Sequence, residues 1–152
     1  MKKYWRSKVL DKEAVRLAHC EFFEILGKID RNDIVRDLRL ELLNCSCENL
    51  DRFNDDIYVI GEYLMKIGVG DLIFDNFNSE DFLLSDDGVY YLIGYVVSLG
   101  RDSFLRIAQD PLLVVELFSN LDDLQEASDL GESLLCSVNH ALRIKNCQER
   151  IF

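Results

Sequence analysis

The sequence contains little proline, few histidines and no long apolar run. Pro111 is the one proline, and no Gly-, Ser- or Pro-rich stretch divides the 152 residues. We therefore expect a single domain, residues 1–152. No apolar run approaches the ~20 residues that a membrane span needs, and the basic N-terminus lacks the apolar segment of a signal peptide. These absences predict a cytoplasmic protein without membrane contact.

The scarcity of histidine and of catalytic motifs argues against an enzyme. His19 and His140 lie in separate helical patterns. His19 is adjacent to Cys20, but neighbouring helix residues point about 100° apart and cannot form a nucleophile–base pair. The chain has no Gly-rich phosphate loop, nucleophile elbow or H-E-x-x-H motif. We expect no catalytic activity and no cofactor.

The chain contains five cysteines, which is an odd number. The five are Cys20, Cys45, Cys47, Cys136 and Cys147. An odd number without a secretion signal predicts reduced thiols. Cys45-Ser46-Cys47 would supply two metal ligands, but a structural zinc site needs four, usually as two close pairs, and no second pair exists. We therefore expect no metal site.

Cations are nearly absent from half of the chain. Residues 67–142 contain only Arg101 and Arg106 against 14 Asp and Glu, and this stretch accounts for essentially all of the net charge of −11. A field of one sign attracts basic partners and repels nucleic acid and anionic membranes. It also destabilises the folded chain by self-repulsion, so the excess suggests a functional role.

The apolar residues recur at helical spacing along almost the whole chain. They make up 49% of the sequence, and stripes at i, i+3, i+4 and i+7 predict amphipathic helices. We expect about seven helices: one within 11–29, one within 32–43, one from a cap at Asn54 to Gly68, one from Ser85 or Asp86 to Gly100, a short one from Asp102 or Ser103, one from Asp110-Pro111, and one over about 122–146. The predicted fold class is all-α.

Three segments, 28–36, 66–74 and 98–106, share a helix end, a turn, a polar position and an apolar pair. Their spacing of 38 and 32 residues is typical of two-helix repeats that stack into solenoids. Any helical protein with short loops repeats such helix ends and turns without being a solenoid. The prediction is a short solenoid-like stack of helical hairpins or a compact helical bundle.

Acidic residues of the stretch 67–142 are the main candidates for partner binding. They are Asp71, Asp75, Glu80, Asp81, Asp86, Asp87, Asp122, Asp123, Glu126 and Asp129. Spacings of four and three place Asp122, Glu126 and Asp129 on one helix face. Helix capping and surface solvation explain most single acids, but not the near absence of Lys and Arg. The Asp86-Asp87-Gly88 segment lacks the alternating oxygen ligands of a calcium loop.

Two tyrosines accompany the acids. Tyr91 and Tyr95 are one helical turn apart. Tyrosine is favoured at interfaces because it buries a large area and keeps a polar tip. Core packing explains the pair equally well at this stage. We include both as candidate anchors for a partner.

The small single domain, the acidic stretch 67–142 and the lack of a catalytic set together resemble a bacterial immunity protein. Such proteins neutralise the toxins of contact-dependent growth inhibition and other polymorphic toxin systems. The resemblance implies stoichiometric inhibition of a basic toxin, most often a nuclease, with carboxylates in place of substrate phosphates. Phage-encoded acidic inhibitors and nucleic-acid mimics share this profile.

A second function class fits the same helical pattern. A helical adaptor binds a peptide or helix in an apolar groove, as virus-encoded helical-bundle regulators of host signalling do. Binding by the acidic inhibitor depends steeply on salt, whereas binding in an apolar groove depends on it weakly.

Overall fold

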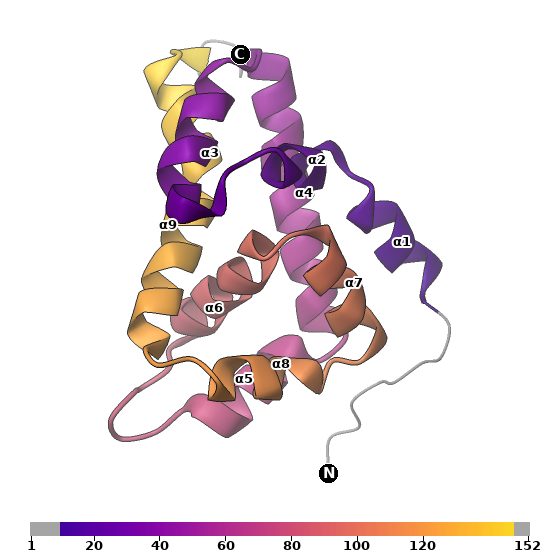
Figure 1. Ribbon diagram of the computed structural model, residues 1–152, viewed down its shortest axis with the longest axis vertical. Coiled ribbons are helices and arrows are strands. Elements are labelled where there is room, and N and C mark those ends of the chain that lie inside the picture. The colour runs from indigo at the N-terminus through magenta and orange to yellow at the C-terminus, as the bar shows by residue number, and fades with distance from the viewer. Residues whose placement is uncertain (1–9, 148–152) are drawn as a thin grey trace.

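The computed structural model describes residues 10–147, and over this range the chain is helical without a strand (Figure 1). The elements are α1 (Lys12–Ala18), α2 (Glu21–Gly27), a 3₁₀ turn η1 (Arg31–Asp33), α3 (Ile34–Leu43), α4 (Cys47–Lys66), α5 (Val69–Phe77), α6 (Asp86–Ser98), α7 (Arg101–Gln109), α8 (Leu113–Ser119) and α9 (Leu124–Ile144). The all-α prediction is confirmed. The predicted count of about seven is low, because the described range holds nine α-helices.

Two differences explain the count. The first predicted helix is broken at His19 and Cys20, so that α1 and α2 are separate elements. The helix α5 was not predicted; it has only nine residues and follows the end of α4 after a short turn at Gly68. The helix α4 also begins earlier than expected, since Ser46 and not Asn54 accepts the capping hydrogen bond, from the backbone N–H of Asn49.

Several predicted helix boundaries are confirmed. Ser85 Oγ accepts from the Gly88 N–H at 3.0 Å and caps α6. Gly68, with a φ of 95°, lies in the left-handed region between α4 and α5, where an L side chain would be strained.

Two further predicted helix starts differ from the structure. The predicted start of α7 is wrong, since its N-cap is Gly100 and not Asp102 or Ser103. The predicted start of α8 at Asp110-Pro111 is also wrong, because the N-cap is Leu112 and the helix begins at Leu113.

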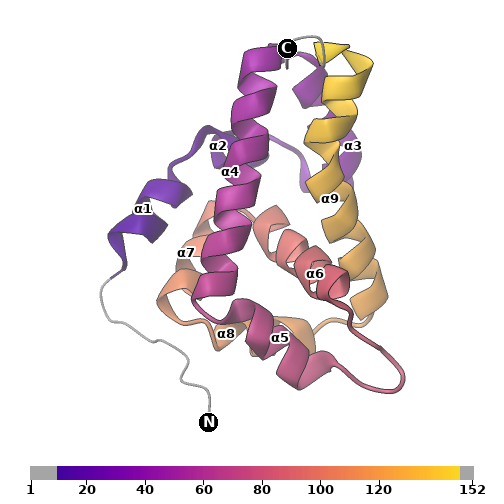
Figure 2. The same cartoon turned by 180° about the vertical axis from the view of Figure 1, so that it is seen from behind.

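The two longest helices, α4 and α9, form the frame of the molecule (Figures 1 and 2). The helix α9 packs against α3, α4 and α6. These elements are far from α9 in the sequence, whereas each repeat of a solenoid contacts only its neighbours. The described helices therefore form a compact bundle, which is the second of the two predicted architectures.

Aromatic rings fill the core where α2, α4 and α7 meet. The ring centroids of Phe23 and Phe104 are 5.3 Å apart, and those of Tyr63 and Phe104 are 6.0 Å apart. All three side chains are buried. Tyr63 also donates a hydrogen bond to Asp11 Oδ2 at 3.3 Å, which ties the N-cap of α1 to α4.

A disulfide joins Cys47 and Cys147, with 5.6 Å between their Cα atoms. The prediction of reduced thiols is therefore wrong for this pair. The residues are 100 positions apart, and they meet because the start of α4 and the end of α9 lie at the same end of the bundle. Lys145 Nζ donates to the carbonyls of Leu43 and Cys45 at this end, so α3 joins the same cluster. Cys20, Cys45 and Cys136 are free.

Candidate functional site

Four of the ten predicted acids line two cavities beside the loop that leads from α8 to α9. A cavity of about 580 Å³ lies between this loop and the α5–α6 loop, and Asp81, Asp122 and Asp123 are among the residues that line it. A cavity of about 290 Å³ lies on the α6 side and includes Tyr95 and Glu126. Both cavities share Leu121, Asp122 and Asp123. We call Asp81, Tyr95, Asp122, Asp123 and Glu126 the acidic cleft.

The floor of the acidic cleft is aromatic. The ring of the buried Phe118 lies 5.8 Å from Tyr95 and 5.7 Å from Phe77, measured between centroids. Partial burial raises the pKa of the Tyr95 phenol, and the charge of Glu126 raises it further. The Tyr95 hydroxyl is therefore held protonated beside a carboxylate. This combination offers a ring face and acidic oxygens at one place.

The acids of the cleft have different local roles. Asp123 caps α9 by accepting from the Glu126 N–H at 3.1 Å, so its carboxylate also supports the fold. Asp129, one turn beyond the cleft, accepts from Gln125 Nε2 at 2.8 Å. Asp122 and Glu126 are exposed and make no ion pair within residues 10–147. Their charge is free to act on a partner.

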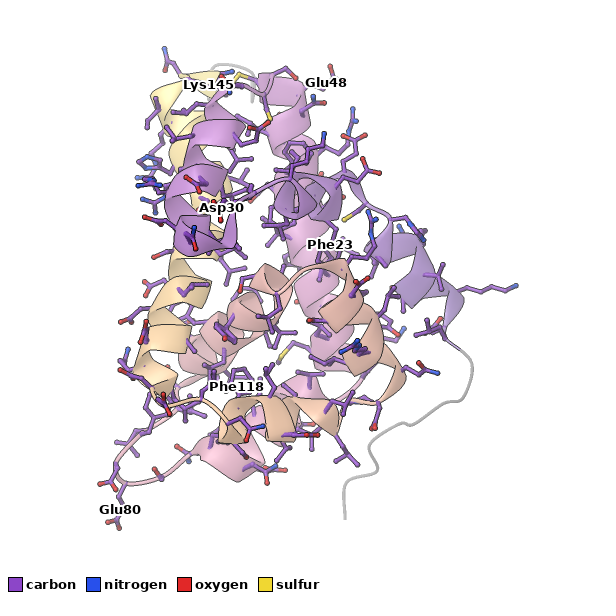
Figure 3. All side chains as sticks on the ribbon, viewed as in Figure 1. Phe23, Asp30, Glu48, Glu80, Phe118 and Lys145 are labelled. Carbon is purple, nitrogen blue, oxygen red and sulfur yellow. A yellow bond between two sulfur atoms is a disulfide. The ribbon has the colours of Figure 1, made fainter. Side chains whose placement is uncertain are left out.

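The remaining predicted residues lie outside the acidic cleft. Asp71 and Asp75 are exposed on α5, and Asp86 and Asp87 form the exposed first turn of α6. Glu80 is at the tip of the α5–α6 loop, directed away from the helices (Figure 3). The structure thus brings together five of the twelve predicted residues and leaves the other acids on the surrounding surface.

Tyr91 lies on α6 beside a second group of carboxylates. The charge of Glu132 on α9 raises the pKa of the Tyr91 phenol, with smaller contributions from burial and from Asp87. Glu132 was absent from the predicted set because its position opposite Tyr91 depends on how α6 and α9 cross. Phe82, which also lines the larger cavity, was not in the predicted set either, since the sequence favours core packing for the phenylalanines that accompany the acids.

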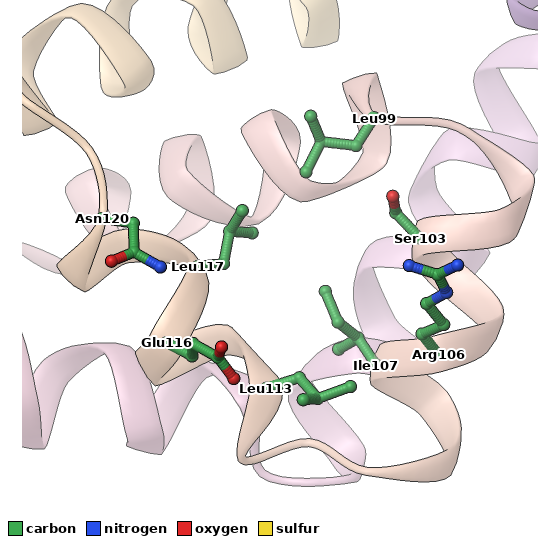
Figure 4. A pocket seen from close by; sticks show the side chains of 8 residues that line it. All are labelled: Leu99, Ser103, Arg106, Ile107, Leu113, Glu116, Leu117 and Asn120. Atoms are coloured by element: carbon green, nitrogen blue, oxygen red, sulfur yellow. The ribbon is translucent and has the colours of Figure 1, made fainter.

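An apolar groove lies between α7 and α8 (Figure 4). Its volume is about 260 Å³, and Leu99, Ile107, Leu113 and Leu117 form its apolar walls, with Arg106, Glu116, Ser103 and Asn120 also lining it. Arg106 comes from α7 and Glu116 from α8, so the two edges carry opposite charges. Sequence reasoning did not identify these residues, because each belongs to an ordinary amphipathic stripe.

Over residues 10–147 no helix combines the length and the apolar character that crossing a bilayer requires. The same range contains no group of three or more His, Cys, Asp or Glu side chains arranged to hold a metal ion. No protein-family model, curated protein or solved structure matches the chain.

Proposed function

We propose that this protein is a stoichiometric inhibitor of the immunity type, which binds a basic toxin through the acidic cleft. The observation that carries the proposal is the cluster of unpaired Asp122 and Glu126 next to the half-buried ring of Tyr95. The stretch 67–142 contains only two cations, and within residues 10–147 neither carboxylate makes an ion pair. A basic partner would supply the missing charge.

The cleft suits a Lys or Arg side chain of the partner. A cation over the Tyr95 ring gains about 0.5–2 kcal/mol from the ring quadrupole, and Asp122 and Glu126 can accept its N–H groups as charge-assisted hydrogen bonds. In a nuclease such cations bind substrate phosphates, so their occupation would block the substrate groove. The surrounding acids, including Asp86 and Asp87, would speed the encounter by long-range attraction.

The test compares two variants with the same change in charge. Asp122→Asn with Glu126→Gln removes two charges from the cleft and leaves the cap at Asp123 intact. Asp55→Asn with Glu62→Gln removes two exposed charges from α4. With the partner captured from the native host, we expect the cleft variant to bind about tenfold more weakly at low salt, which corresponds to ~1.4 kcal/mol. The control variant should bind like the parent.

An equal loss of affinity in both variants would mean that only the net charge of the protein matters. No loss of affinity in either variant would show that the acids serve only to keep the surface soluble. The nuclease assignment has its own test, which is cleavage of DNA or RNA by the captured partner. Addition of one equivalent of the parent protein should abolish the cleavage. Addition of one equivalent of the cleft variant should leave part of the cleavage activity.

The second candidate is a helical adaptor that binds a peptide in the apolar groove between α7 and α8. The specific observation in its favour is the group of four apolar side chains that line the groove, with Arg106 and Glu116 on opposite edges. Binding there would depend weakly on salt. A partner whose affinity changes little between 0.05 and 0.5 M salt would support the adaptor over the inhibitor.

The disulfide bears on the compartment in which the protein acts. Disulfides persist in oxidising compartments and are rare in the cytosol. A cytoplasmic inhibitor, as we propose, would carry Cys47 and Cys147 as thiols, whereas the structure shows them joined. Titration of free thiols in protein isolated from its host, with rapid acid quenching, distinguishes the two states.

A further inference from the structure

The end of the bundle where α9 terminates is held by a covalent link and by hydrogen bonds. The disulfide joins Cys47, the first residue of α4, to Cys147 in the turn that follows α9. Lys145 Nζ donates to the carbonyl of Leu43, at 3.2 Å, and to that of Cys45, which lie at the end of α3 and just beyond it. We call Cys47, Cys147 and Lys145 the clasp (Figure 3).

The helix α3 depends on α9 for its place in the bundle. It packs mainly against α9, with smaller contacts to α2 and η1. Leu38 and Leu42 of α3, and Val138 and Ala141 of α9, are fully buried, but a cavity of about 370 Å³ with residues of both helices in its lining lies between them. We call this contact the α3–α9 seam. A helix held largely by one neighbour can open locally at a lower free energy than global unfolding requires.

The two residues of the disulfide differ in exposure. Cys147 is 4% exposed, whereas Cys47 is half-buried. A disulfide is reduced when a thiolate attacks one of its sulfurs, and access decides which sulfur is attacked. An external thiol therefore reaches Cys47 more easily than Cys147. Accessible disulfides are the labile and regulatory ones, in contrast to structural disulfides that resist the glutathione pool.

The other cysteines favour a reversible disulfide with an external reductant. Cys20, Cys45 and Cys136 are free thiols, and three free thiols beside one disulfide point to an environment that is not strongly oxidising. Cys45 Sγ donates to the Glu41 carbonyl at 3.6 Å, and burial raises the pKa of its thiol. Because the thiolate is the nucleophile, Cys45 is a poor internal reductant despite its place beside the clasp.

We propose that the clasp is a redox switch that controls opening of the α3–α9 seam, with a monothiol of the glutathione class as the reductant. The monothiolate attacks Cys47 Sγ and the S–S bond breaks, so that a mixed disulfide forms on Cys47 and Cys147 leaves as a thiolate that takes up a proton. A second monothiolate attacks the external sulfur of the mixed disulfide and releases Cys47, which is protonated in turn. The protein gains two electrons and two protons, and two monothiols lose them as they form their own disulfide.

Reduction removes the covalent link and leaves the Lys145 hydrogen bonds. The last turn of α9 then separates from α4 more often, and the α3–α9 seam opens with it, while α6 and α7 stay folded. The acidic cleft lies at the other end of α9, where Asp123 is the N-cap. The switch is therefore independent of the proposed inhibitor function, and its tests need no partner.

Amide hydrogen exchange of the parent, with and without reduced glutathione, is the first test. Loss of the disulfide lowers the global stability and so speeds exchange throughout the core. The readout is therefore the difference between elements. Exchange in α3 and in the C-terminal half of α9 should speed at least tenfold more than exchange in α6 and α7. An equal change in all helices, or no change, would overturn the switch.

Three variants assign the effect to the clasp. Cys47→Ser without reductant should reproduce the exchange pattern of the reduced parent, and Cys136→Ser, which removes a free thiol, should respond to glutathione as the parent does. Lys145→Met should leave the seam closed in the oxidised protein and speed α3 exchange further in the reduced one. A Cys47→Ser variant that is unfolded by circular dichroism would overturn local opening, and one that exchanges like the oxidised parent would overturn the role of the disulfide.

Reversibility separates a switch from a structural disulfide. Exchange of reduced for oxidised glutathione should restore the disulfide and slow α3 exchange to its starting rate. Mass spectrometry of samples quenched with acid during reduction should find glutathione on Cys47, and Cys45→Ser should be reduced at the rate of the parent. A disulfide that resists glutathione in the folded protein would overturn the switch. An adduct on Cys147, or slower reduction of Cys45→Ser, would overturn the proposed path of attack.

Discussion

Gly94 of α6 and Gly131 of α9 cross with their backbones in contact. A Cβ added to Gly94 would lie 2.7 Å from the Gly131 carbonyl oxygen, and one added to Gly131 would lie 1.8 Å from the carbonyl oxygen of Tyr91. No side chain fits between the helices at this point. The close crossing places Tyr95 beside Glu126 and Tyr91 beside Glu132, so it assembles both tyrosine–carboxylate groups.

Gly131→Ala should therefore destabilise the fold by at least ~3 kcal/mol, because the new methyl group overlaps backbone that cannot move aside. Gly27→Ala is the control, since nothing lies within 4 Å of a Cβ there, and it should stabilise α2 by about 0.4–1 kcal/mol. Urea denaturation of both variants measures the difference. A Gly131→Ala midpoint within error of the parent would contradict the crossing.

Loss of the disulfide should reduce stability strongly. The Cys47–Cys147 bond closes a loop of 100 residues, for which chain entropy in the unfolded state predicts about 4–5 kcal/mol. Cys47→Ser should lower the urea midpoint accordingly, and a reductant should lower that of the parent to the same value. Cys136→Ser, at an exposed free thiol, should leave it unchanged. Coincident midpoints for all proteins with and without reductant would show that the bond adds nothing.

Asp56 gives the stability a defined pH dependence. Burial raises the pKa of its carboxyl, although a hydrogen bond from the Phe22 N–H partly opposes the shift. A raised pKa in the folded state means that the protonated acid is favoured there, so its contribution is most favourable at low pH and is lost as pH rises through the folded pKa. Asp56→Asn should raise the melting temperature at pH 7.

The increase in melting temperature from Asp56→Asn should shrink as the pH falls towards the pKa of Asp56 in the folded state, because the parent carboxyl then becomes neutral as well. Asp55→Asn, at the exposed neighbouring position, provides the control for the change in net charge. Melting curves at pH 4, 5, 6 and 7 are sufficient. A gain that does not depend on pH would show that the charge of Asp56 is not the cause.

Asp123 tests whether capping and binding can be separated. Asp123→Asn keeps an N-cap acceptor for the Glu126 N–H and should leave the free energy of unfolding nearly unchanged, whereas Asp123→Ala should cost about 1 kcal/mol. Both substitutions remove the same charge. If the charge of Asp123 contributes to partner binding, both variants should bind more weakly by the same factor, and a binding loss confined to Asp123→Ala would assign Asp123 to the fold alone.

The sequence alone determined several features that depend on neighbouring residues, although the predicted starts of α4, α7 and α8 were wrong. Helical spacing predicted the all-α class, and the caps at Ser85 and Gly68 were correct, because capping is a hydrogen-bonding matter between residues three or four apart. The charge asymmetry of residues 67–142 is likewise a property of composition. It identified the acids from which the cleft is built, but not which of them lie together.

Only the tertiary structure decided the contacts between distant segments. The pairing of Cys47 with Cys147 and the crossing at Gly94 and Gly131 both depend on how the helices pack. Local periodicity predicts which face of a helix is buried. It does not predict which other helix covers that face, because many apolar helices could pack against it equally well. The packing angle and register come from the fit of side chains between helices, which no single stripe contains.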